Sequence, residues 1–200
     1  METDQALSHK RVANSTFRRN QSGAAALEFA MISPLILVAM LEVFQGAAYL
    51  YCSAAVERAT SLATRTIMVG SLTPEASTAA GFKSTALCPA LMPGLSCANV
   101  IISLQTATVG PSAPGYAAFV KADLSGLLPA NMDSNQATYC AGSAGAYQYL
   151  QVFYALPLIS PIWKLISGQN WNGKIVTFVR SAAAFRNEPY TGTSVTTSCP

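Results

Sequence analysis

A long hydrophobic run follows a polar start in this chain of 200 residues. Between Ala24 and Val56, the only acidic or basic side chains are those of Glu28 and Glu42. A helix needs roughly 20 predominantly apolar residues to cross a bilayer. The run is long enough for one crossing, provided that its two acids are accommodated, and we therefore predict a single spanning helix.

The end of this helix is marked by Gly70 and Pro74, since glycine caps helices and proline cannot continue them. The helix is thus expected over residues 24–68, and it would be about 68 Å long at 1.5 Å per residue. Pro34, which lacks an amide donor, is expected to kink or loosen its turn. Because the helix exceeds the thickness of a bilayer, its outer half must pack on another part of the chain.

Three later stretches combine β-branched and aromatic residues between turn residues, which predicts strands. They are Asn99–Thr108, Tyr147–Leu156 and Lys174–Phe185. Short helices are expected at residues 74–86, 116–127 and 159–166. Trp163, in the last of these, and Trp171, just after it, should cover one face of the sheet. The predicted fold class is α+β, with a long N-terminal transmembrane helix followed by a small antiparallel sheet that packs against it.

Composition and charge disfavour several classes of protein. Charged residues make up 10% of the chain and apolar residues 51%, whereas an average soluble domain has roughly 25% charged residues. These values disfavour an ordinary cytosolic enzyme and exclude a disordered chain. The net charge of +3 is too small for a nucleic-acid-binding footprint. The basic surplus before the hydrophobic run places the N-terminus in the cytoplasm and the remainder outside the inner membrane.

The two acids in the run need an explanation, because an acid at the centre of a membrane helix costs about 2.5–3.5 kcal/mol on insertion scales. In the simpler interpretation, Glu28 reaches the cytoplasmic edge and Glu42 marks the far headgroup layer. The other interpretation gives Glu28 a role in assembly, and it depends on the sequence that precedes the run.

That sequence is Gly23-Ala24-Ala25-Ala26-Leu27-Glu28-Phe29, preceded by two arginines. It resembles the leader junction of type IV prepilins of the Flp, or tight-adherence, branch. The resemblance implies that a prepilin peptidase cuts after Gly23, so that Ala24 becomes the new N-terminus and the hydrophobic helix is kept. It also implies that Glu28, beside Phe29, pairs in assembly with the free amine of Ala24 on a neighbouring subunit.

The resemblance extends to TadE-like minor pilins, or pseudopilins. It is carried by an acid and aromatic pair followed by a proline flanked by aliphatic residues, by the small-residue helix of residues 54–65, and by Arg186-Asn187-Glu188-Pro189-Tyr190 near the C-terminus. The resemblance implies a pilin-like fold without a cofactor. After the cut, 177 residues would remain, and a TadE-like minor pilin of an Flp pilus used for surface adherence fits this size.

The domain organisation follows from these features. Residues 1–23 are expected to be a cytoplasmic prepilin leader, residues 24–69 the anchor and assembly helix, and residues 70–200 a periplasmic or extracellular α+β domain. The expected partners are the prepilin peptidase, other pilin and pseudopilin subunits, the inner-membrane pilus assembly machinery and the lipid bilayer, with no nucleic acid. The expected location is the bacterial inner membrane, from which the chain enters an extracellular pilus.

Four of the five cysteines follow the helix, where an oxidising compartment favours disulfides. Cys88, Cys97, Cys140 and Cys199 allow three pairings, and sequence alone does not choose among them. Proximity favours Cys88 with Cys97, which leaves Cys140 with Cys199; free thiols remain the alternative. Cys52 is expected to be a small apolar residue on the helix, with an intersubunit bridge as the alternative.

Catalytic patterns are weak in this sequence. The only histidine, His9, lies in the expected leader, the acids beyond Gly70 are scattered, and the Cys-x-x-Cys pattern of zinc and redox sites is absent. We expect no catalytic residue, metal site or enzyme activity. The main alternative function is an uncut, single-pass periplasmic binding or sensory protein. A protein secreted after cleavage at Ala48 and a lipoprotein beginning at Cys52 rank lower.

Overall fold

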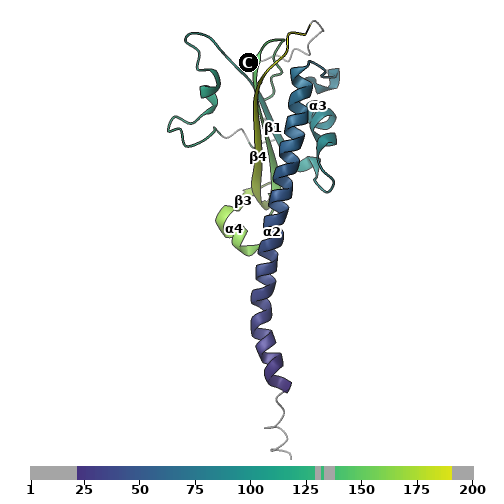
Figure 1. The fold of residues 1–200 in the computed structure, drawn as a ribbon, viewed down its shortest axis with the longest axis vertical. Helices are drawn as coiled ribbons and strands as arrows, with labels where there is room; N and C mark the ends of the chain where they lie inside the picture. The colour runs from purple at the N-terminus through teal and green to yellow at the C-terminus, as the bar shows by residue number, and fades with distance from the viewer. Residues whose placement is uncertain (1–21, 129–131, 133–137, 191–200) are drawn as a thin grey trace, which may run out of the picture. The chain divides into compact units, whose positions relative to one another are not determined.

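The computed structural model describes residues 22–128, 132 and 138–190 (Figure 1). Most of the expected leader, residues 1–21, lies outside them. The chain forms two compact units, residues 1–44 and 45–200, with the boundary inside the first helix. The fold is α+β, as predicted, with a long apolar helix and a small antiparallel sheet of four strands.

Helix α2 runs from Ser22 to Met68 without a break, through Pro34. It ends where the sequence predicts. Gly70 has a φ of +68°, its N–H donates to the Ile67 carbonyl, and the Ser71 N–H donates to the Thr66 carbonyl. These two bonds form a Schellman motif, in which a glycine in the left-handed region stops the helix.

The sheet has the strand order β1-β2-β4-β3, and every pairing between neighbouring strands is antiparallel. Strands β1 (Val100–Ala107), β2 (Tyr147–Pro157) and β4 (Lys174–Arg186) confirm the three predicted strands to within one residue at each end. The short strand β3 (Gln169–Trp171) was not predicted. It joins β4 through Asn172 and Gly173, which have φ angles of 48° and 74°. Asn-Gly with two positive φ angles is the preferred two-residue hairpin turn.

One face of the sheet packs against the second half of α2 (Figure 1). The buried residues of α2 in this core recur every three or four positions, which is the spacing of one helix face. They are Cys52, Val56, Ala59, Ala63 and Ile67. The predicted packing of the outer half of the helix is therefore confirmed within residues 45–200.

The other face of the sheet carries Phe119, from the connection between β1 and β2, and Trp171, from β3. Phe119 stacks on Tyr149 at 4.5 Å between ring centroids, and Trp171 meets Phe178 edge to face at 6.2 Å. Because both faces are covered, β2 is buried along nearly its whole length. Trp171 covers this face as predicted. Trp163 instead contacts Tyr49 of α2.

The helix predicted at residues 74–86 is a series of short pieces: η1 (Pro74–Ser77), α3 (Ala79–Phe82) and η2 (Lys83–Leu87). The break has a local cause, because the Thr78 side chain caps α3 by accepting from the Gly81 N–H at 3.1 Å. The short turns η3 (Cys88–Ala90) and η4 (Cys97–Asn99) follow, and then β1 begins.

The helix predicted at residues 116–127 is wrong beyond its first turn. Only η5 (Gly115–Phe119) forms, and Val120 then bridges to Leu127. Leu124 has a φ of 56°, which no right-handed helix accepts, and Asp123 caps Ser125 in a turn. The third predicted helix is present as α4 (Pro161–Ser167), capped by Ser160.

Candidate functional site

The predicted cleavage and assembly residues lie at the start of α2. Gly23, Ala24, Glu28 and Phe29 are all exposed there. A Cβ added to Gly23 would meet no atom within 4 Å. The described residues thus give no packing reason for a glycine at this position. Any requirement for it must come from a partner that binds the sequence around Gly23.

The first half of α2 exposes large apolar side chains on all sides. The exposed set is Leu27, Phe29, Met31, Ile32, Leu35, Ile36, Leu37, Val38, Met40, Leu41, Val43 and Phe44. A contiguous surface of this kind is rare on a soluble monomer and marks contact with a membrane or with other proteins. By length and composition, the helix over residues 23–68 is able to span a membrane.

Glu28 is an exposed acid within this apolar surface. No ion pair to it is recorded among the residues that the structure describes. Glu42 differs, because it is half-buried and interacts within the fold. When Glu28 leaves water, its charge would need a counter-charge from outside the described part of the chain.

Residues 186–190, which carry part of the family resemblance, contact the end of α2. The Glu188 N–H donates to the Met68 carbonyl at 2.8 Å, at the end of α2. The ring of Tyr190 covers Gly70 so closely that a Cβ there would lie 2.7 Å from it. These contacts join the end of β4 to the end of α2.

Asn187 provides the second set of contacts. Its side-chain amide donates to the carbonyls of Gly142 and Ser143 at 2.9 and 3.0 Å, and its backbone N–H donates to the Ala146 carbonyl at 2.9 Å. Arg186 donates through Nε to the Gly145 carbonyl at 3.1 Å. The Gly142–Gly145 segment is therefore a fixed turn. Sequence reasoning missed this role because the partners are about 40 residues apart.

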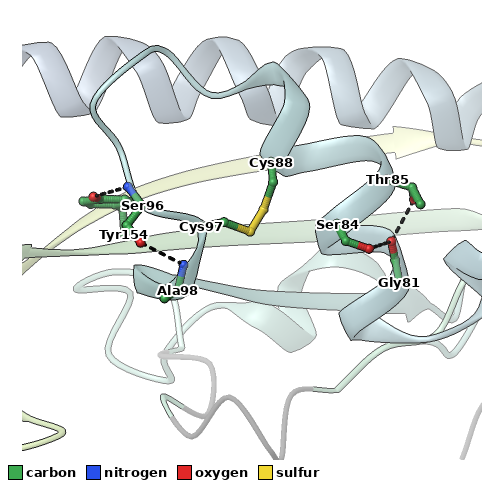
Figure 2. Close-up of a disulfide and its surroundings, with 8 residues drawn as sticks. All are labelled: Gly81, Ser84, Thr85, Cys88, Ser96, Cys97, Ala98 and Tyr154. Atoms are coloured by element: carbon green, nitrogen blue, oxygen red, sulfur yellow. Dashed lines mark hydrogen bonds between the residues drawn. A yellow bond between two sulfur atoms is a disulfide. The ribbon is translucent and has the colours of Figure 1, made fainter.

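The structure joins Cys88 to Cys97 in a disulfide, with the two Cα atoms 5.6 Å apart (Figure 2). This is the pairing that proximity favours. The loop that it closes also meets the sheet, where the Ser96 N–H donates to the Tyr154 hydroxyl at 3.2 Å. The disulfide thus fixes the segment between α2 and β1 on the core.

The other cysteines have different surroundings. Cys140 is buried, with Sγ 3.0 Å from Thr106 Oγ1, and its predicted partner Cys199 lies outside the described residues. Cys52 is a buried free thiol in the α2 core. Its predicted role as a small apolar residue on the helix agrees with this position, and a bridge to another subunit would require it to become accessible.

Outside α2, local burial and hydrogen bonds shift the pKa of several titratable side chains. Burial raises the pKa of Tyr139, whose hydroxyl donates to the Ala76 carbonyl at 2.6 Å. Hydrogen bonds from Ser125 lower the pKa of the exposed Asp123. Within residues 22–128, 132 and 138–190, no three His, Cys, Asp or Glu side chains gather as a metal site would require. These shifts come from local structure and do not form an acid–base pair.

An open cleft of about 970 Å³ lies between the end of β1 and the 108–114 loop. Phe119 and Gln151 are among its lining residues, and none of the described residues that line it is charged. A small or extended neutral ligand is the chemistry that such a lining accepts.

Together these features define a coarse class: an α+β domain carried on a long apolar helix that is able to cross a membrane. No protein-family model, curated protein or solved structure matches the chain.

Proposed function

We propose that this chain is a TadE-like minor pilin, or pseudopilin, that is trimmed after Gly23 and takes part in assembling an Flp-type pilus for surface adherence. The observation that carries the proposal is the division of α2 into two halves. Its first half exposes apolar side chains all round, whereas one face of its second half is buried against the sheet.

This division suits a subunit that moves between two apolar environments. Residues 24–44 lose their contact with water either in lipid or in a bundle of similar helices. The same apolar side chains are removed from water in both surroundings. The folded unit of residues 45–200 keeps its own core in either state. The same chain would thus reside in the inner membrane and later enter a fibre without refolding.

Glu28 would control docking between subunits. A carboxylate withdrawn from water and lipid needs a cation, and cleavage after Gly23 creates one at the amine of Ala24. Pairing of Glu28 with the Ala24 amine of a neighbouring subunit favours one stagger of the helices. The pairing requires prior cleavage, so only processed subunits would dock correctly.

The experiment that tests processing compares Gly23→Ala with Gly46→Ala in cells that carry the assembly system. Neither added Cβ meets an atom within 4 Å, so both variants should fold. Gly23→Ala should leave most of the chain with its leader, whereas Gly46→Ala should be trimmed as the wild type is. Equal trimming of both variants, read as intact mass, would refute cleavage after Gly23.

The second candidate is an uncut, single-pass periplasmic binding or sensory protein, and the cleft beside β1 favours it. In this case the leader would remain on the mature chain. The identity of the N-terminal residue separates the two functions, because the pilin function requires Ala24 and the binding function retains the initiator methionine.

A further inference from the structure

Helix α4 has no buried residue, although it is attached to the folded unit. Its apolar side chains and those beside it face outward: Ile159, Ile162, Leu165, Ile166 and Ile175 have exposed fractions of 72, 45, 88, 79 and 48%. We call these five residues the α4 patch. Apolar side chains gathered in this way mark a surface that contacts something other than water.

The position of α4 on the domain is fixed. Oε1 of the buried Gln45 accepts the Ile159 N–H at 2.9 Å, and Tyr49 packs on Trp163 with 5.6 Å between ring centroids. At the other end, a Cβ on Gly168 would lie 2.8 Å from Cγ2 of Ile175, so glycine lets α4 lie close to β4. Figure 1 shows α4 beside α2, at the end of the sheet that carries β3.

The residues that hold α4 follow directly after residues 24–44, the half of α2 that exposes apolar side chains all round. The run from Ala24 to Phe44 has 21 residues and is about 30 Å long, which equals the thickness of the hydrocarbon layer. Gln45 and Tyr49, which hold α4, are among the first residues of the folded unit. A membrane that contains residues 24–44 would thus have its far surface near Gln45, the residue whose side chain holds Ile159 beside α4.

The chemistry around the patch fits the surface of a bilayer. Trp163 lies within α4, and tryptophan favours the boundary between lipid chains and headgroups. Lys164 and Lys174 are exposed, and residues 159–175 contain no acidic side chain. Exposed lysines beside an apolar face attract anionic headgroups.

We propose that the α4 patch inserts into the headgroup and upper acyl region of the membrane that holds α2, so that the domain has a second contact with lipid. The inference rests on the proposed membrane anchoring. It adds that the domain lies against the bilayer until the subunit is extracted, and that extraction must remove α4 from the lipid together with α2.

The test uses the full chain in vesicles of phosphatidylcholine and phosphatidylglycerol. Trp163 and Trp171 are the only tryptophans, so Trp171→Phe leaves Trp163 as the single fluorophore. Its emission should be quenched more strongly by lipids brominated near the headgroup than by lipids brominated near the chain end. The wild-type chain, which keeps both tryptophans, serves as the parallel measurement if Trp171→Phe does not fold.

The patch itself is tested with Leu165→Glu/Ile166→Glu. This double variant should lose the shallow quenching and shift the Trp163 emission to the red. The matched control is Leu124→Glu, which replaces an apolar side chain that is 81% exposed in the connection between β1 and β2. It should leave the quenching unchanged.

Flotation of the vesicles separates this inference from the anchoring on which it rests. A chain that floats with the vesicles while Trp163 stays unquenched overturns the α4 contact and leaves the anchor in place. Quenching that persists in the double variant also overturns it. If the double variant changes only association with other pilus subunits, the patch is a protein interface and the inference is wrong. A chain that does not float refutes both the anchor and the inference.

Discussion

At the scale of single residues, Glu28 and Asn187 represent two kinds of polar group. Glu28 is exposed on an apolar helix surface, whereas Asn187 is buried and donates to two carbonyls. The Gly23–Phe29 pattern makes Glu28 a candidate from sequence alone. No comparable pattern predicts Asn187, because its partners in the Gly142–Gly145 turn lie far away in the chain.

Glu28→Ala should leave cleavage after Gly23 intact and reduce the number of pili per cell severalfold, since the Ala24 amine of the neighbouring subunit loses its acid. The measurement is the intact mass of the chain together with counting of pili by electron microscopy. Glu57→Ala, which removes an exposed acid from the second half of α2, is the control and should assemble normally. Normal pili on Glu28→Ala cells would show that the pairing idea is wrong.

Asn187→Ala should lower the free energy of unfolding by about 1–3 kcal/mol, because the buried Asn187 amide no longer donates to the Gly142 and Ser143 carbonyls. Equilibrium unfolding of the full chain in detergent micelles, followed by tryptophan fluorescence, measures the change. Asn170→Ala on the exposed strand β3 is the control, with an expected change within about 0.5 kcal/mol. A similar loss in both variants would mean that Asn187 does not hold the 142–146 turn.

At the scale of elements, the long strands, the end of α2 and the short helix α4 were predictable, whereas strand β3 and the breaks at residues 74–87 and 116–127 were not. The three long strands and the end of α2 follow from β-branched runs and from Gly70. Strand β3 has only three residues, and its one sequence signal is the Asn172-Gly173 turn. The error at residues 116–127 has a different cause, because the turn at Asp123 and Leu124 overrides helix propensity.

The packing of α2 on the sheet depends on small residues at the contact. Ala63 is fully buried there, so Ala63→Leu should overpack the core and cost about 1–3 kcal/mol in the free energy of unfolding. The adjacent Leu62 is 46% exposed, and Leu62→Ala should change that energy by less than about 0.5 kcal/mol. Denaturant titration of both variants in micelles checks this. An unchanged midpoint for Ala63→Leu would contradict close packing of the helix on the sheet.

At the scale of the whole molecule, one helix serves two purposes. Its second half is part of the core of the folded unit, and its first half exposes apolar side chains that need lipid or neighbouring helices. The disulfide between Cys88 and Cys97 and the contacts of residues 186–190 hold the folded unit together. The ability of α2 to span a membrane was predictable from sequence, because it depends only on the length of the helix and on the hydropathy of its residues. The α4 patch was not, because its exposure depends on how distant segments pack.

The intact mass of the chain purified from its native membranes tests the central claim most directly. We predict the mass of residues 24–200, with Ala24 at the N-terminus and four hydrogens missing, two for the Cys88–Cys97 bridge and two for the predicted Cys140–Cys199 bridge. A chain that still begins at Met1, or one that has lost the apolar run of α2, would contradict the account.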